Sequence, residues 1–274
     1  MRFLRKPSGL IGLIGIACLL LLALFANILA PADPWAIGAR PLLAPLEKGY
    51  IFGTDSLGRD VAAGVIHGAR VSVFIGVASA LATGLIGVTM GLVAGYAGGW
   101  LDAALTRTTE FFQVIPAIVL AVVVLSFAGP NMITIILVIA LISWPPIARL
   151  ARAETMALRH REFVMAARLQ GESRLSILTG HILPNAAPPL IAALSLSIAT
   201  AILTESALAF LGLGDPNTMS WGYMIGSGRT MMRQAWWITA FPGVALMLSV
   251  LCINLATGAY SDDLTQRLTQ KGSQ

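Results

Sequence analysis

The stretch that decides the fold is LIGLIGIACLLLLALFANILA, residues Leu10–Ala30. It contains thirteen Leu, Ile and Phe residues and no charged residue. A bilayer core about 30 Å thick requires roughly 20 apolar residues in a helix that rises about 1.5 Å per residue. Three basic residues, Arg2, Arg5 and Lys6, precede the stretch, as they precede cleaved signal peptides. Because the apolar run exceeds the roughly 7–15 residues of a signal core, we expect an uncleaved transmembrane helix.

The composition of the whole chain excludes a soluble globule. Of its 274 residues, 57% are hydrophobic and 11% are charged, whereas soluble domains have about 45–50% and about 25%. The mean hydropathy is +0.80. The formal net charge of +5 indicates membrane orientation rather than nucleic-acid binding, because the basic residues flank apolar runs. Cys18 and Cys252 fall inside such runs, so we expect two small buried hydrophobic residues and no disulfide.

Further apolar runs predict five more spans and thus an all-α membrane protein with six transmembrane helices. They lie at Val71–Gly95, Phe111–Ala128, Met132–Ile147, Pro188–Leu211 and Ile238–Ala259. The third helix is expected to begin early, near Leu101, because Asp102, Arg107 and Glu110 have the spacing of one helix surface. The fourth is expected to end or kink at Pro145-Pro146, since proline removes a hydrogen-bond donor and clashes with the preceding turn.

The distribution of Lys and Arg predicts the orientation. If the N-terminus is cytoplasmic, six of the 18 basic residues lie outside, namely Arg40, Lys48, Arg59, Arg70, Arg229 and Arg233, and the other twelve lie inside. The positive-inside rule therefore places both termini in the cytoplasm. We expect an N-terminal span and outer segment (residues 1–70), a core transmembrane domain (residues 71–260) and a cytoplasmic tail (residues 261–274).

Motifs of common enzymes are absent from the sequence. None of the three Lys residues stands in a GxxxxGK[ST] phosphate-binding loop, and the three His residues form no HExxH pair. A GxSxG nucleophile elbow is absent too. We expect no enzymatic activity and no cofactor in this chain.

The densest charge lies in a segment at about residues 150–185, which is predicted to form a hairpin on the cytoplasmic face. Strong helix formers run from about Glu154 to Gln170. Gly171 is suited to end that helix in a left-handed conformation, and Ser173 to cap the next helix. Ala166 and Ala167 leave a shallow surface for another protein, while Phe163 is suited to anchor in a pocket of that protein. The alternative is a solvated amphipathic loop that satisfies the positive-inside rule.

The string AARLQG (166–171), nine residues and then HILP (181–184) resembles the EAA loop of binding-protein-dependent ABC importers. The resemblance implies a coupling helix that docks on a cytoplasmic ATPase. The chain departs from the strict motif at Met165, where the family has Glu, and at His181, where it has Ile. The coupling residues implied, with the neighbours that complete the helix, are Glu162, Phe163, Ala166, Ala167, Arg168, Gly171, Leu183 and Pro184.

Other strings resemble the C subunits of dipeptide- and oligopeptide-type permeases, within the peptide and nickel branch of that family. They include FGTDSLGRDV (Phe52–Val61) and SALAFLGLG (Ser206–Gly214), and the match extends from about residue 50 to Asn254. The tail departs, with NLATGAYSDDLTQR where the family commonly has NLLGDGLRDALDP.

The resemblance implies one half of a type I importer in a bacterial or archaeal cell membrane, the inner membrane where there are two. A second, homologous permease, two ATPase subunits that hold ATP and Mg, and an extracytoplasmic substrate-binding protein would be its partners. Short peptides are the expected substrate, and nickel or a metal chelate is the alternative within the family. An alternative from another class is a stand-alone secondary transporter.

Two smaller signals concern the interior of the spans. Gly87, Gly91 and Gly95 recur every four residues, which predicts a face that a neighbouring helix approaches closely, in this chain or in a partner. Glu205 is the one acidic residue deep in the fifth run, and an unpaired charge there is costly. It is expected either to contact substrate in the translocation pathway or to be a buried partner of a backbone group or an Arg.

Overall fold

The computed structural model describes the backbone of residues 7–272 and the side chains of residues 7–261. The described chain is helical, without a strand. Short 3-10 or π turns stand at Glu47–Gly49, Ile177–Ile182, Ala209–Leu213 and Arg229–Met231. The α-helices are α1 (Pro7–Leu24), α2 (Ala26–Leu29), α3 (Val61–Ala97), α4 (Gly99–Val114), α5 (Ala117–Ala128), α6 (Met132–Leu158), α7 (Glu162–Leu169), α8 (Arg174–Ser176), α9 (Leu183–Leu208), α10 (Trp221–Gly228) and α11 (Trp237–Gly272).

The number of spans agrees with the six expected. Five helical segments of the described chain are long and apolar enough to cross a membrane, and there are six if the bent pair α4 and α5 is counted as one span. α4 begins at Gly99, close to the expected early start. The pair is not straight, however, because the chain bends by 86° between the two helices. Ile115 is extended and precedes Pro116, as expected for a residue whose α-helical conformation proline disfavours.

The expected end of the fourth span at Pro145-Pro146 is wrong. α6 continues through both prolines to Leu158. Pro145 and Trp144 are buried, and the carbonyl oxygen of Trp144 lies 2.9 Å from where a Cβ on Gly87 of α3 would be. Close packing against α3 therefore supports the helix across both prolines, as neighbouring helices commonly do for prolines in membranes.

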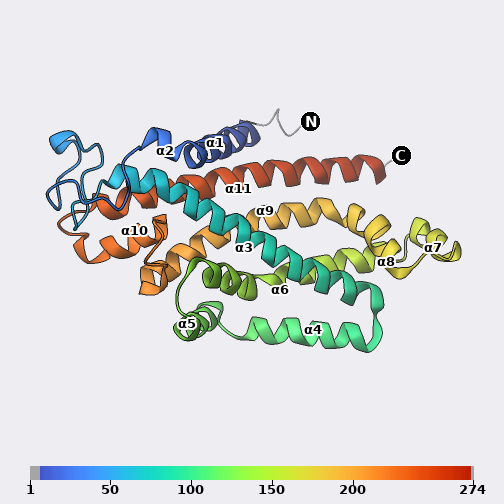
Figure 1. Cartoon of the computed structure of the whole chain (residues 1–274). Helices are drawn as coiled ribbons and strands as arrows, with labels where there is room; N and C mark the ends of the chain where they lie inside the picture. Colours follow the sequence, from blue (N-terminus) through green and yellow to red (C-terminus); the bar gives the residue numbers. More distant parts are fainter. Residues whose placement is uncertain (1–6, 273–274) are drawn as a thin grey trace.

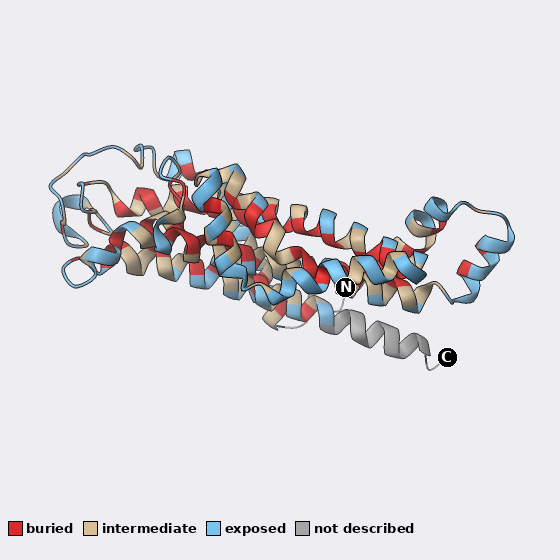
Figure 2. Cartoon of the chain, turned by 90° about the horizontal axis from the view of Figure 1, so that it is seen from below, coloured by how far each residue is buried: buried red, intermediate tan, exposed pale blue. Residues whose placement is uncertain are grey.

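The long helices form one elongated bundle. α3, α6, α9 and α11 run side by side, and α1 lies along α11 (Figure 1). At one end, which we call the hairpin end, α7 and α8 project beyond the bundle; residues 31–60 and α10 form the opposite end, the loop end (Figures 1 and 2). The first turn of α1 and the last described turns of α11 point towards the hairpin end (Figure 1).

α1 packs on α11 through small residues. A Cβ on Gly12 would lie 2.5 Å from the backbone nitrogen of Ala256, and one on Gly15 would meet the Cys252 sulfur. Cys18 and Cys252 are both free, and Cys18 is exposed rather than buried as expected. Close approach of glycine-bearing helices is a common way to associate helices in lipid.

At the loop end, Thr54 holds the segment before α3 in place. Its hydroxyl donates to the Arg40 carbonyl at 2.8 Å and accepts from the Leu43 amide at 2.9 Å. Its carbonyl accepts from the Trp237 indole nitrogen at 3.1 Å. The segment is thereby attached to the start of α11.

Candidate functional site

The projecting hairpin, residues 159–184, is shaped by a break after α6. The single helix expected over Glu154–Gln170 is wrong, because α6 ends at Leu158 and α7 begins at Glu162. Arg159 donates to the Gly95 carbonyl of α3 at 2.8 Å, and Arg161 adopts an extended conformation. The turn thus fixes the chain to α3 and redirects it, which helix propensity alone does not anticipate.

The C-terminal end of α7 has the glycine stop and the serine cap that were expected. Gly171 has φ +81°, the left-handed region that favours glycine. The hydroxyl of Ser173 accepts from the Ser176 amide at 3.2 Å and caps α8. The chain then passes through a π turn, Ile177–Ile182, directly into α9, which begins at Leu183 and Pro184.

The inner face of α7 is part of a small hydrophobic core. Val164 and Ala167 pack with Ile177, Ile182 and Leu92. Ala167 is only 3% exposed. The expectation that Ala166 and Ala167 share a docking surface is therefore wrong for Ala167, which holds the hairpin together instead.

The outer face of α7 is apolar and uncovered. Phe163 is 41% exposed and Leu169 is 90% exposed, and Ala166 lies between them on the helix and is also exposed. Glu162 and Arg168 are exposed at the two ends of this face. Exposed apolar side chains on a projecting helix whose inner face is packed suit contact with another protein.

Three polar contacts hold the hairpin in place. The Arg168 guanidinium lies over the ring of Tyr96 in α3, 5.0 Å from its centroid. Glu172 accepts from the Ser176 hydroxyl at 2.8 Å, and His181 Nε2 lies 3.2 Å from its carboxylate. The Ser176 hydrogen bond, and then that of His181, lowers the pKa of Glu172.

The three glycines of the expected close-packing face lie against α6 of the same chain. An added Cβ would lie 2.8 Å from Ile147 at Gly87, 2.5 Å from Ala151 at Gly91 and 2.7 Å from Thr155 at Gly95. None of these distances leaves room for a methyl group. The contact connects α3 to α6 down to the hairpin end.

Glu205 lies inside the protein. It is 2% exposed. Its carboxylate accepts from the Ser220 hydroxyl at 2.6 Å and from the Ser206 hydroxyl at 3.3 Å, and a Cβ on Gly222 would lie 2.7 Å from Oε2. Its partners are two serine hydroxyls beside the start of α10, neither the backbone group nor the Arg that was expected.

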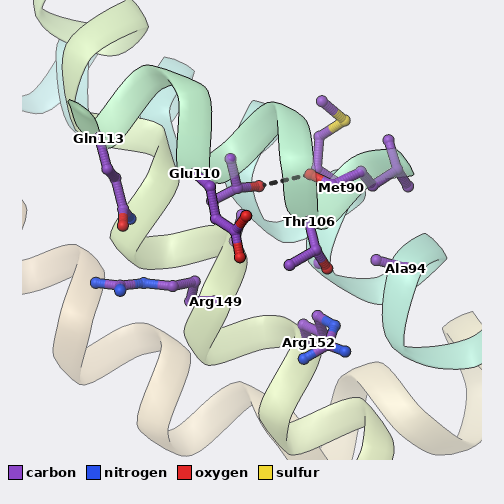
Figure 3. Close-up of a pocket in the computed structure, with 11 residues that line it drawn as sticks. Met90, Ala94, Thr106, Glu110, Gln113, Arg149 and Arg152 are labelled. Carbon is purple, nitrogen blue, oxygen red and sulfur yellow. Dashed lines mark hydrogen bonds between the residues drawn. The ribbon is translucent and has the colours of Figure 1, made fainter. Parts of the chain in front are cut away.

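The sequence did not predict a cleft between α4 and α6, lined by both apolar and polar residues, which we call the α4–α6 cleft. Figure 3 shows Glu110 and Gln113 of α4 pointing towards the helix that carries Arg149 and Arg152. The Arg152 side chain makes an ion pair with Asp102, with 2.6 Å between Nε and Oδ1. The polar surface of α4 was visible in the sequence. Arg149 and Arg152, which face it, were assigned to a loop because α6 was expected to end at Pro145-Pro146.

Among the residues whose side chains are described, no three of His, Cys, Asp or Glu are grouped closely enough to hold a metal ion. The described side chains end at residue 261, so the atypical tail, with Arg267 and Lys271, lies outside them. The basic residues Arg2, Arg5 and Lys6 also lie outside the described residues.

The bundle with its projecting hairpin has the fold of the membrane subunits of ABC importers. It superposes with a TM-score of 0.60 on a chain of the inward-facing methionine ABC transporter MetNI, at 19% identity, covering 73% of this chain and 95% of that one. Residues 87–269 match the family described as binding-protein-dependent transport system inner membrane component. Residues 1–45 match the N-terminal transmembrane domain of oligopeptide transport permease C.

Individual relatives cover almost the entire chain. The di/tripeptide transport system permease protein of Pseudomonas aeruginosa is 38% identical over 97% of this chain and 90% of its own length. The dipeptide transport system permease protein of Haemophilus influenzae is 36% identical over 98% and 93%. The chain therefore belongs to the family of binding-protein-dependent transport system inner membrane components. It is a multi-pass membrane protein of that family.

Proposed function

We propose that this chain is one of two permease subunits in an ATP-driven importer of di- and oligopeptides. The observation that carries the proposal is the similarity, over nearly the full length, to permease proteins named for dipeptide and di/tripeptide transport. The names of these relatives favour peptides over nickel or a metal chelate. The substrate itself would be delivered by a separate binding protein at the loop end.

The hairpin is the proposed docking site for the ATPases. Phe163 and Ala166 would contact a groove of one ATPase subunit, with Glu162 and Arg168 at the edges of the contact. Two such subunits would hold ATP and Mg and carry out hydrolysis. The exposure of this face and the buried packing of Val164 and Ala167 beneath it support the assignment.

The attachment of the hairpin to the bundle gives a route by which movement of the ATPases would reach the membrane helices. Arg159 and Arg168 connect it to Gly95 and Tyr96 at the end of α3, and Leu183 and Pro184 connect it to α9 without an intervening loop. A push on α7 would therefore tilt α3 and α9 together. In a pair of permeases, such a tilt would switch a shared cavity between inward- and outward-facing states.

The proposed topology places the hairpin end in the cytoplasm, together with both termini. The direction of α1 and α11 in Figure 1 supports it, as does the excess of basic residues in the segments assigned to that side. A tag at either terminus that is accessible only from outside would contradict this orientation.

Ala166→Asp tests the docking site, because Ala166 is exposed and the change adds a charge without disturbing the core beneath it. The matched control is Ala36→Asp, the same change at an exposed position of the loop end. We expect Ala166→Asp to insert normally but to lose co-purification of the ATPases and dipeptide uptake, while Ala36→Asp keeps the ATPases. Full ATPase recovery with Ala166→Asp would refute docking through this face. Import of nickel but not of dipeptide by the intact transporter would refute the peptide assignment.

A further inference from the structure

The α4–α6 cleft has the shape of a small, open binding site. Its volume is about 200 Å³. Gly91 and Ala94 of α3 and Thr109 of α4 are buried and form its floor. Gly91 and Ala94 lie only three to six residues before the end of α3 at Ala97, which is about 5–9 Å along the helix. The cleft is therefore close to the hairpin end.

Three polar side chains stand around the mouth of the cleft, and all three are exposed: Glu110, Gln113 and Arg149. Glu110 and Gln113 are three residues apart and so share one face of α4. Arg149 extends from α6 below Gln113 (Figure 3). A carboxylate, an amide and a guanidinium thus converge from two helices on one space.

These groups are available to a ligand. Among the described side chains, Gln113 and Arg149 have no hydrogen-bond or ion-pair partner. Glu110 pairs with Arg107 at 3.1 Å, but these side chains are 53% and 84% exposed. An exposed ion pair of this kind contributes little, about 0–1 kcal/mol, and opens readily.

Arg149 lies in a helix that is long and apolar enough to span the membrane. A cation in such a helix is costly unless it faces water, an acidic group or a polar ligand. The neighbouring Arg152 is neutralised by Asp102, whereas the described structure gives Arg149 no acidic partner. Arg149 therefore requires water or a polar group beside the cleft rather than lipid tails.

We propose that the α4–α6 cleft contacts the charged ends of a transported short peptide while the pathway is open to the hairpin end. The proposal rests on the peptide importer function proposed above. Arg149 and Gln113 bind the terminal carboxylate, and Glu110 binds the terminal ammonium group. A guanidinium presents two parallel donors that match a carboxylate, and the amide of Gln113 supplies a further donor.

The combination of charges favours a zwitterion over an anion. The phosphate of an anionic lipid would satisfy Arg149 but would meet the like charge of Glu110. The volume also fits a transient contact. Sites that enclose a small molecule commonly measure about 300–1,000 Å³, so this smaller, open cleft contacts the charged ends of a short peptide without enclosing it and releases it readily.

Ligand binding to the complete transporter in nanodiscs, without the binding protein, tests the proposal. The probes are the dipeptide Ala-Ala, its C-terminal amide and its N-acetyl form, and binding is followed by saturation-transfer NMR. We expect Arg149→Gln to weaken Ala-Ala binding by about tenfold, the loss of one charge-assisted contact, and to remove the preference for the free carboxylate. Glu110→Gln should instead remove the preference for the free amino group.

Arg233→Gln is the matched control, because it removes the same charge at an exposed position of the loop end. It should bind all three probes like the wild type. Wild-type binding by Arg149→Gln, or an equal loss of all three probes in both cleft variants, would overturn the proposal. Displacement of Ala-Ala by phosphatidylglycerol in the nanodisc that depends on Arg149 would also overturn it, in favour of a lipid headgroup site.

Dipeptide uptake, measured on the same wild-type preparation with its binding protein, separates the two proposals. If the wild type imports dipeptide while the cleft variants bind the probes unchanged, the cleft assignment alone is wrong. If the wild type imports no dipeptide at all, the proposed function is wrong.

Discussion

Arg152 donates two hydrogen bonds to the carboxylate of Asp102, from Nε to Oδ1 at 2.6 Å and from Nη2 to Oδ2 at 2.8 Å. The pair joins α6 to α4 across fifty residues of sequence, and both side chains are largely shielded, at 33% and 18% exposed. Two parallel bonds fix the relative orientation of the helices as well as their distance. The pair therefore holds the wall of the α4–α6 cleft at the hairpin end.

Asp102→Asn and Arg152→Gln should each lower thermal stability. Because the pair is bidentate and shielded from solvent, we expect a coupling energy of about 1–3 kcal/mol in a double-mutant cycle on the purified transporter. The control is the Arg107–Glu110 pair of the same helix, whose exposed side chains should couple by less than about 1 kcal/mol. Equal coupling for the two pairs would show that shielding does not strengthen the Asp102 contact.

Gly91→Ala should destabilise the contact between α3 and α6. The new methyl group would lie 2.5 Å from the Ala151 side chain and against the backbone of α6, and such overpacking costs about 1–3 kcal/mol. Gly258→Ala in α11 is the control, because its Cβ would meet nothing within 4 Å. Thermal unfolding in detergent should show a lower midpoint for Gly91→Ala only. A midpoint equal to that of the control would mean that the helices separate without cost.

The stability of the hairpin should depend on pH through Glu172. Hydrogen bonds from Ser176 and then His181 lower its pKa in the folded state. The stabilisation is therefore present above the ordinary glutamate pKa, about 4.3, and is lost as the pH falls through the lowered value. Hydrogen exchange of the α7–α8 amides, corrected for intrinsic rates, should accelerate over that acidic range in the wild type. Glu172→Gln should remove this acceleration, and its persistence in that variant would assign the effect to another group.

The sequence predicted the features that depend on local chemistry. The number of spans follows from hydropathy, and Gly171 and Ser173 follow from the demands of a helix end. The features it did not predict depend on packing between distant segments. The 86° bend at Pro116 and the passage of α6 through Pro145-Pro146 are opposite outcomes for similar local signals. Only in α6 does the close packing of α3 support the helix across the prolines.

The α7 surface and the α4–α6 cleft show the same division between features set by local sequence and features set by packing of distant segments. The apolar and alanine-rich composition of α7 indicated a contact surface, but which alanine faces outward depends on where α7 begins, and that is set by Arg159 on the Gly95 carbonyl. The α4–α6 cleft was missed because Arg149 and Arg152 were assigned to a loop. Once α6 continues past the prolines, their three-residue spacing places them on one helix face towards α4.

Replacement of Glu205 should affect the position of α10 more than the recognition of substrate. Its carboxylate accepts from Ser220, whose hydroxyl in turn accepts from the Tyr223 amide and caps α10. Glu205→Ala removes the acceptor and leaves a buried gap, so we expect a loss of about 2–4 kcal/mol and faster hydrogen exchange in α10. Glu205→Gln keeps an acceptor oxygen for Ser220 and should retain most of both stability and uptake. Loss of uptake in Glu205→Gln without any change in the exchange of α10 would instead place the carboxylate in the translocation pathway.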